Sequence, residues 1–127
     1  MFTIDTTKNL LIYRPEGVIN GESIMGYIQG VLRDPDYQPG LLEYIDLSGV
    51  SEWQLSHSEV EKVTHFDNLD MAPIKKISRT GIYAPTDVAF GMARMYQALA
   101  EKYHSSIFIS KNQDEVLKYL GCSGDDI

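Results

Sequence analysis

The chain has 127 residues, of which 43% are hydrophobic and 23% are charged, and its net charge at pH 7 is −7. This length and composition fit one globular domain and exclude a pair of ordinary domains. The negative charge argues against nucleic acid and anionic membrane surfaces as partners, because both would repel the protein. The sequence shows neither a signal peptide nor an apolar run of the ~20 residues that cross a bilayer, so we expect a cytoplasmic protein without membrane insertion.

The first third of the chain predicts a β-hairpin followed by a helix. Residues 2–7 and 10–14 are rich in strand-forming residues, and Asn9 between them tolerates the left-handed backbone of a tight turn. Asn20 is a good helix N-cap, and Pro35 ends the helix that follows. The apolar side chains of this helix recur at helical spacing: Ile24, Tyr27, Ile28 and Val31.

The middle of the chain predicts a buried strand over residues 41–48 and then a second helix. Ser56 and Glu59 have the spacing of a capping box, in which each side chain bonds to the backbone N–H of the other residue. A further strand is expected within residues 75–84.

The last third predicts two helices separated by a strand. Thr86 caps the longest predicted helix, whose apolar stripe is the strongest amphipathic pattern in the chain. Residues 106–110 form a short strand, Asn112 caps a final helix, and Gly121 ends it. Residues 123–127 are expected to be a frayed acidic tail.

These elements follow the order β-β-α-β-α-β-α-β-α in a single domain over residues 1–122. Strands alternate with helices after the opening hairpin, which predicts an α/β fold with a mostly parallel mixed sheet and helices packed on it. The expected core consists of Ile12, Ile24, Ile28, Val31, Ile45, Leu47, Val60, Val63, Ile82, Met92, Ala93, Tyr96, Leu99, Ile107, Ile109 and Leu117.

Three segments stand out together with the element order: LIYRPEG at 11–17, IDLSGV at 45–50 and APTDVAFGMARM at 84–95. In this combination the chain resembles the SpoIIAA-like family of small bacterial proteins, which is grouped with STAS domains and with CRAL-TRIO lipid-exchange folds. The STAS likeness implies a non-enzymatic regulatory or protein-interaction module. The lipid-exchange likeness implies an alternative, a carrier or sensor of a small apolar or amphipathic ligand, which would need an enclosed apolar pocket of roughly 300 Å³ or more.

Sequence motifs for catalysis or cofactor binding are absent. The chain has no Gly-x-Ser-x-Gly elbow, no phosphate-binding loop and no Gly-x-Gly-x-x-Gly, so we expect no enzymatic activity and no cofactor. His57, Glu61 and His65 recur every four residues, but the outer two would lie about 12 Å apart along a helix, too far to share one metal ion. Cys122 is the single cysteine, and an internal disulfide is therefore excluded.

Ser56 is a candidate phosphoacceptor through the STAS resemblance. In anti-sigma-factor antagonists of that fold, a serine within an Asp-Ser-Ser-Gly sequence after the middle strand is phosphorylated. Ser56 matches that serine, whereas Leu55 and His57 replace its neighbours. A phosphate there would meet the free N–H groups of a helix N-terminus. The alternative, which we favour, is that Ser56 only caps the helix.

A second candidate site is a crevice formed by Asp46, Ser48, Thr86 and Asp87. All four follow predicted parallel strands, and such loops converge at the carboxyl edge of an open α/β sheet. A small anion or polar ligand could bind there. The alternative is that Thr86 only caps its helix, while Asp46 and Ser48 only shape a turn.

A third candidate is an interaction surface around the longest helix. Phe90, Arg94 and Met95 lie on or near one side of that helix, and Trp53 is expected in the loop before the second helix. Aromatic, Arg and Met side chains are enriched at protein interfaces, so this surface would take a protein partner or a second copy of the chain. The alternative is that these side chains belong to a wide buried stripe.

Overall fold

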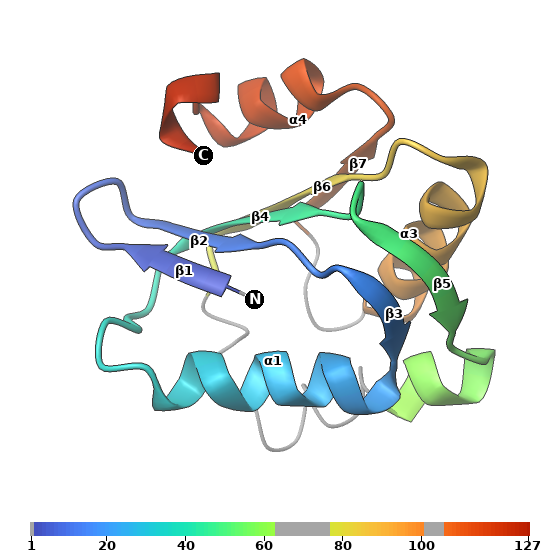
Figure 1. Cartoon of the computed structure of the whole chain (residues 1–127). Coiled ribbons are helices and arrows are strands. Elements are labelled where there is room, and N and C mark those ends of the chain that lie inside the picture. The colour runs from blue at the N-terminus through green and yellow to red at the C-terminus, as the bar shows by residue number, and fades with distance from the viewer. Residues whose placement is uncertain (1, 63–76, 101–105) are drawn as a thin grey trace.

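The computed structural model describes residues 2–62, 77–100 and 106–127, with the side chains of residues 99–100 excepted (Figure 1). A five-stranded sheet has the strand order β1-β2-β4-β6-β7. Its strands are Phe2–Asp5 (β1), Leu10–Tyr13 (β2), Leu42–Asp46 (β4), Arg79–Tyr83 (β6) and Ile107–Ser110 (β7). β1 is antiparallel to β2, and all other neighbours are parallel. The predicted hairpin-opened, mostly parallel mixed sheet is thus confirmed.

The starts of the helices, and the ends of α1 and α4, lie where local sequence signals predict. They are α1 (Gly21–Arg33), a helical segment over residues 57–62, α3 (Asp87–Ala100) and α4 (Gln113–Leu120). The Asn20 side chain accepts from the Ser23 N–H, and the Asn112 side chain accepts from the Asp114 and Glu115 N–H groups. Gly121 ends α4 in the left-handed conformation, with φ of 74°. Side chains that reach only two or three residues along the chain therefore fix these boundaries.

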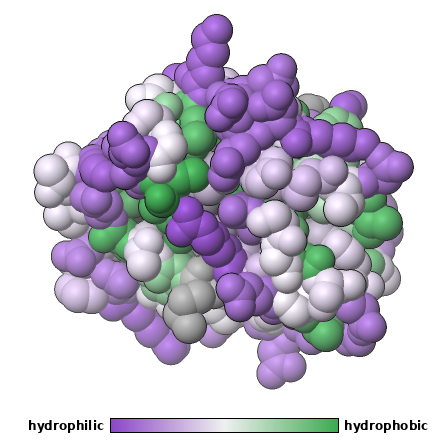
Figure 2. All heavy atoms as spheres, turned by 45° about the horizontal axis from the view of Figure 1, so that its top comes forward, coloured by the Kyte–Doolittle hydropathy of each residue, from purple (hydrophilic) through white to green (hydrophobic). Residues whose placement is uncertain are grey.

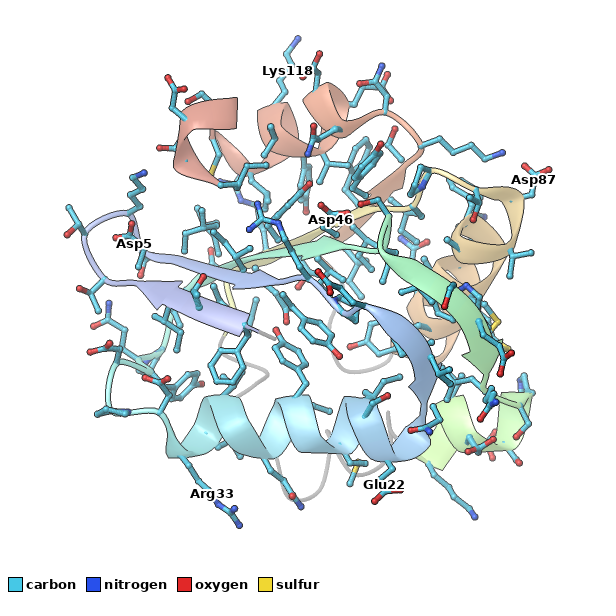
Figure 3. The ribbon with its side chains drawn as sticks, viewed as in Figure 1. Asp5, Glu22, Arg33, Asp46, Asp87 and Lys118 are labelled. Atoms are coloured by element: carbon cyan, nitrogen blue, oxygen red, sulfur yellow. The ribbon has the colours of Figure 1, made fainter. Side chains whose placement is uncertain are left out.

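The order of the sheet decides which face each helix covers. The parallel strands follow one another across the sheet in chain order, and right-handed crossovers then place every connecting helix on the same face. α1 and α3 lie on that face, whereas α4 follows the last strand and covers the opposite face (Figure 1). Glu22 and Arg33 on α1, and Lys118 on α4, point away from the sheet (Figure 3).

Two strands were not predicted from the sequence. Gly17–Asn20 (β3) and Val50–Gln54 (β5) pair in parallel as a separate two-stranded sheet, the β3–β5 arm. The arm continues the β2–β4 pair beyond a break, across which the Gly17 N–H donates to the Gly49 carbonyl at 3.0 Å. Pro15 has no N–H to donate to a neighbouring strand, so β2 ends before it. After this interruption the chain pairs again, as β3 with β5. Trp53, expected in a loop, therefore lies in β5.

The core confirms most of the predicted apolar set. Three clusters fill the space under α1, under α3 and under α4. Nine predicted core residues are buried: Ile12, Ile28, Val31, Leu47, Val60, Ile82, Ala93, Ile107 and Leu117. Five more are half-buried: Ile24, Ile45, Met92, Tyr96 and Ile109. Val63 and the side chain of Leu99 lie outside the described part of the chain.

The C-terminal segment is ordered, although we expected it to fray. Gly124–Asp126 form a 3₁₀ turn (η2), and the Ser123 N–H donates to Asp126 Oδ2 at 2.7 Å. Lys8 in the β1–β2 hairpin forms an ion pair with Asp126 at 3.4 Å and donates to the Asp125 carbonyl. These contacts with a segment far away in the chain hold the tail against the hairpin.

The surface above α4 is mainly polar. Hydrophilic side chains cover most of the face drawn in Figure 2, and hydrophobic ones show as separate areas. None of the helices within residues 2–62, 77–100 and 106–127 combines the length and hydrophobicity needed to span a bilayer.

Gly81→Ala should lower the free energy of unfolding by about 1–3 kcal/mol in urea unfolding. Gly81 lies in β6 beneath α4, and a Cβ there would lie 2.7 Å from Val116 Cγ1 and 3.0 Å from Leu120 Cδ1. Gly91→Ala is the matched control, because Gly91 is exposed in α3 and its Cβ would meet open space. We expect this control to gain about 0.5–1 kcal/mol. A Gly81→Ala variant as stable as the wild type would contradict the close packing of α4 on β6.

Candidate functional site

A cavity of about 110 Å³, here called the inner cavity, lies among the main sheet, the β3–β5 arm, α1 and α3. The arm bends away from the main sheet towards the first turn of α1 (Figure 1). Aliphatic and Met side chains form most of the lining: Ile19, Ile24, Ile28, Ile45, Leu47, Leu55, Val60, Ile82, Met92 and Ala93. Four aromatic side chains and one carboxylic acid complete it: Tyr13, Tyr27, Trp53, Tyr96 and Glu43.

Glu43 is the most unusual residue of the inner cavity. It lies on the central strand β4 and is only 8% exposed. Its Oε1 accepts a hydrogen bond from the Thr80 hydroxyl of β6 at 2.8 Å, and its Oε2 accepts one from the Tyr27 hydroxyl of α1. A buried carboxyl group needs such partners, because an unpaired one would lose its hydration without compensation.

Burial sets the protonation of this cluster. Loss of hydration raises the pKa of Glu43 above its ordinary value of 4.5, while the hydrogen bonds from Tyr27 and Thr80 oppose that rise. Burial, and then the nearby Glu43 carboxylate, raise the pKa of Tyr27 well above 10.0. The same two causes raise the pKa of Tyr13 to about 12. Both tyrosines therefore remain neutral hydroxyl groups at physiological pH.

Aromatic rings hold the cluster in place. The Tyr13 ring of β2 stacks on the Tyr27 ring of α1, with centroids 3.7 Å apart and planes 5° apart. Phe2 of β1 meets Tyr27 edge to face at 5.8 Å. Tyr13 is only 6% exposed, and its hydroxyl makes no hydrogen bond to any residue in the described part of the chain. A donor without a partner thus lines the same cavity as Glu43.

A second hollow, the outer pocket, adjoins the inner cavity. It has a volume of about 280 Å³ and is lined by Phe2, Tyr13, Pro15, Glu16, Val18, Ser23, Gly26 and Tyr27. Val18 is 47% exposed there. Tyr13 and Tyr27 line both hollows, so the stacked pair forms a wall between them.

Glu43 was not predicted from the sequence as a site residue. The sequence does contain a signal for this buried acid, because Glu43 lies in the middle of the apolar run Leu41–Ile45. Such a run is typical of a central parallel strand, which is covered on both faces, so a carboxyl group within it is expected to be buried. Tyr27 was predicted only as part of the apolar stripe of its helix. Its hydroxyl meets the carboxyl group through a contact that no local spacing reveals.

Ser56 forms the predicted capping box. The Glu59 N–H donates to Ser56 Oγ at 3.2 Å, and the Ser56 N–H donates to Glu59 Oε1 at 3.1 Å. Ser56 Oγ also lies 3.1 Å from Ser58 Oγ. The cap is confirmed, and phosphorylation of Ser56 stays a prediction.

The four residues of the predicted crevice lie in separate local arrangements. Asp46 accepts from the Ser48 N–H at 2.9 Å and faces Arg14 at 3.7 Å. Thr86 accepts from the N–H of Ala89 and so caps α3. Asp87 pairs with Lys111 at the periphery, well away from Asp46 (Figure 3). None of the four predicted residues lines the inner cavity or the outer pocket.

The predicted interaction surface is divided between core and exterior. Trp53 lines the inner cavity, and both Trp53 and Phe90 pack against the cluster under α3. Arg94 is exposed, with its guanidinium carbon 5.9 Å from the Phe90 ring centroid. Lys111 lies 5.7 Å from the same ring, and Met95 is half-buried.

Metal ligands do not gather in the described part of the chain, where no group of three His, Cys, Asp or Glu side chains could hold an ion. Of the predicted histidine–glutamate row, His65 lies outside the described residues. Cys122 is half-buried, and burial raises the pKa of its thiol, which keeps it in the unreactive protonated form.

Comparison with solved structures identifies the architecture. The chain is similar to an uncharacterised protein of the DUF3478 family from Shewanella loihica PV-4, whose structure is described as SpoIIAA-like. The match covers 94% of this chain and 92% of that chain, with a TM-score of 0.57 and 12% sequence identity. This chain has a SpoIIAA-like fold. No protein-family model and no curated protein matches the sequence.

Within the SpoIIAA-like fold of this chain, the Tyr27 hydroxyl should contribute more to the free energy of unfolding than the Tyr13 hydroxyl. Tyr27→Phe removes a donor from the buried Glu43 carboxyl and should lower the free energy of unfolding by about 1–3 kcal/mol. Tyr13→Phe keeps the ring stack and should lose no more than about 0.5 kcal/mol. Urea unfolding of both variants measures the difference. Equal losses would show that the hydrogen bond to Glu43 contributes nothing specific.

Glu43→Gln should change how stability depends on pH. Because burial raises the pKa of Glu43, the folded protein keeps a proton there that the unfolded chain has lost above pH 4.5. The free energy of unfolding of the wild type therefore falls as pH rises from 4.5 through the raised pKa, and this contribution is absent from Glu43→Gln. The stability of the variant relative to the wild type should rise over that window and then level off.

Urea unfolding at a series of pH values from 4.5 to mildly alkaline measures this difference. Glu22→Gln, at an exposed position of α1, controls for the loss of one carboxylate. A Glu43→Gln curve that runs parallel to the wild type at every pH would show that Glu43 titrates alike in the folded and unfolded chains.

Proposed function

We propose that this chain is a non-enzymatic regulatory module that binds a small, mainly apolar ligand in the inner cavity. The observation that carries the proposal is an apolar cavity with one hydrogen-bonded acid, Glu43, and one hydroxyl, that of Tyr13, which has no hydrogen-bond partner among the described residues. Ligand sites in proteins commonly combine apolar walls with a few convergent polar groups.

The volume limits the size of the ligand. About 110 Å³ is less than the roughly 300 Å³ typical of sites for larger ligands. It is close to an engineered apolar cavity of about 150 Å³ that binds benzene. A single ring or a short branched chain is therefore the largest body that the inner cavity would take, and any longer portion of a ligand would have to extend beyond it.

The hydrogen bonding favours binding over catalysis. Both oxygens of Glu43 are held by hydroxyl groups, from Thr80 and Tyr27. An acid fixed in this way is suited to orient a polar group of a ligand, whereas a general base needs a free path to a reacting proton.

A regulatory role fits the way the cavity is built. Its walls come from separate elements, namely the main sheet, the β3–β5 arm, α1, α3 and the helical segment over residues 57–62 with Leu55 before it. A ligand that bridges them would favour one relative arrangement of these elements, and a partner on the outer side of α3 would sense that arrangement.

Ala93→Leu should abolish ligand binding by filling the cavity. Ala93 lies on α3, is 4% exposed and lines the inner cavity, so a larger side chain there would occupy the space of the ligand. We expect benzene, toluene or cyclohexanol to bind the wild type, detected by NMR shift changes and a raised unfolding temperature. Binding should weaken by about tenfold or more in Ala93→Leu, the loss expected when a ligand no longer fits an apolar site.

Ala98→Leu is the control, since Ala98 is exposed on the same helix and the substitution adds the same side chain outside the cavity. Its ligand binding should match the wild type. If none of the three compounds binds the wild type, or if a folded Ala93→Leu protein binds them equally well, the proposed function is wrong.

A further inference from the structure

Resting on the proposed function, we propose that the inner cavity selects a small organic cation, an ammonium group on a short aromatic or aliphatic body. Glu43 would be its counter-ion, and the rings of Tyr13, Tyr27 and Trp53 would surround its apolar part. The inference follows from the charges, the aromatic side chains and the hydrogen bonds that line the cavity.

The charges of the lining favour a cation over an anion. Glu43 is the only Asp, Glu, Lys, Arg or His among the described residues that line the inner cavity, and Glu16 is the only one in the outer pocket. An anionic ligand would meet these two acids without a described cationic side chain to pair with it. The net charge of −7 adds a long-range attraction for cations.

The aromatic lining supplies a second attraction of the same sign. Tyr13, Tyr27, Trp53 and Tyr96 reach the cavity from β2, α1, β5 and α3. The face of an aromatic ring attracts cations. Because the Tyr13 and Tyr27 rings stack on each other, only one face of each is left for a ligand. A carboxylic acid among such rings recognises a cation better than it recognises a neutral molecule of the same shape.

The hydrogen bonds from Tyr27 and Thr80 hold the Glu43 carboxyl group in position for this role. In the empty cavity burial favours its neutral form, and Tyr13, Tyr27 and Tyr96 are the other titratable groups that line the cavity in the described part of the chain. When an ammonium ion enters, the Glu43 carboxyl releases its proton to solvent, and the carboxylate pairs with the cation. The Tyr27 and Thr80 hydroxyls continue to donate to the carboxylate.

This exchange of a proton for a cation makes binding depend on pH. Below the raised pKa of Glu43, each bound ammonium ion displaces one proton, so affinity should rise by up to about tenfold per pH unit. Above that pKa the affinity should become constant. A neutral ligand of the same shape displaces no proton and should bind equally across the range.

The experiment compares benzylamine, benzyl alcohol and benzoate, which share a ring and differ in charge. Calorimetry at neutral pH should show that benzylamine binds the wild type about tenfold or more tightly than benzyl alcohol, and that benzoate does not bind. Glu43→Gln should reduce benzylamine affinity by about tenfold or more and leave benzyl alcohol within about twofold. Glu22→Gln, at an exposed position of α1 that lines neither hollow, is the matched control and should leave benzylamine within about twofold of the wild type.

Benzyl alcohol serves as the test that the cavity of Glu43→Gln is intact. If that variant does not fold, the pH series on the wild type replaces it, and a benzylamine affinity that is independent of pH overturns the inference. The inference also fails if benzyl alcohol binds the wild type as tightly as benzylamine, or if Glu43→Gln binds benzylamine normally. In those cases the apolar ligand site stands, whereas binding by none of the three compounds would remove the proposed function as well.

Discussion

A carboxyl group in the middle of the central strand constrains the arrangement around it. Burying Glu43 removes its hydration, which is unfavourable by several kcal/mol unless donors replace the lost water. The donors come from different elements, the Tyr27 hydroxyl of α1 and the Thr80 hydroxyl of β6. Satisfying one side chain therefore fixes the position of α1 over the sheet. The same contact places Tyr27 against Tyr13, and the stacked rings become the wall between the two hollows.

The break between β2 and β3 supplies the space that this cluster borders. Apolar cores are normally packed to the density of organic crystals, so an internal cavity needs a structural cause. Here the strand pair β2–β4 is interrupted at Pro15 and Gly49 and resumes as the β3–β5 arm in a separate sheet. Side chains of the arm, including Ile19 and Trp53, form one wall of the inner cavity.

The SpoIIAA-like fold does not by itself decide what the cavity binds. The Shewanella loihica structure shares the architecture of this chain at 12% sequence identity. At that level two proteins share a fold, but the chemistry of a site in one cannot be assigned to the other. Any ligand of the inner cavity would be selected by residues of this chain, above all Glu43 and the rings beside it. Among the surface candidates from the sequence, Ser56 and Thr86 cap helices, and Asp87 pairs with Lys111.

The sequence by itself determined the features that depend on neighbours along the chain. Asn9 marks the hairpin with φ of 55°, and Ser56 bonds to a residue three positions away, because turns and caps join atoms that the chain keeps close. Hydrophobic periodicity likewise gave the α/β class. Only the tertiary structure decided the β3–β5 pairing, the partners of Glu43 and the inner cavity. Tyr27 lies 16 residues from Glu43 and Thr80 lies 37 residues from it, so their contact exists only once strands and helices have packed.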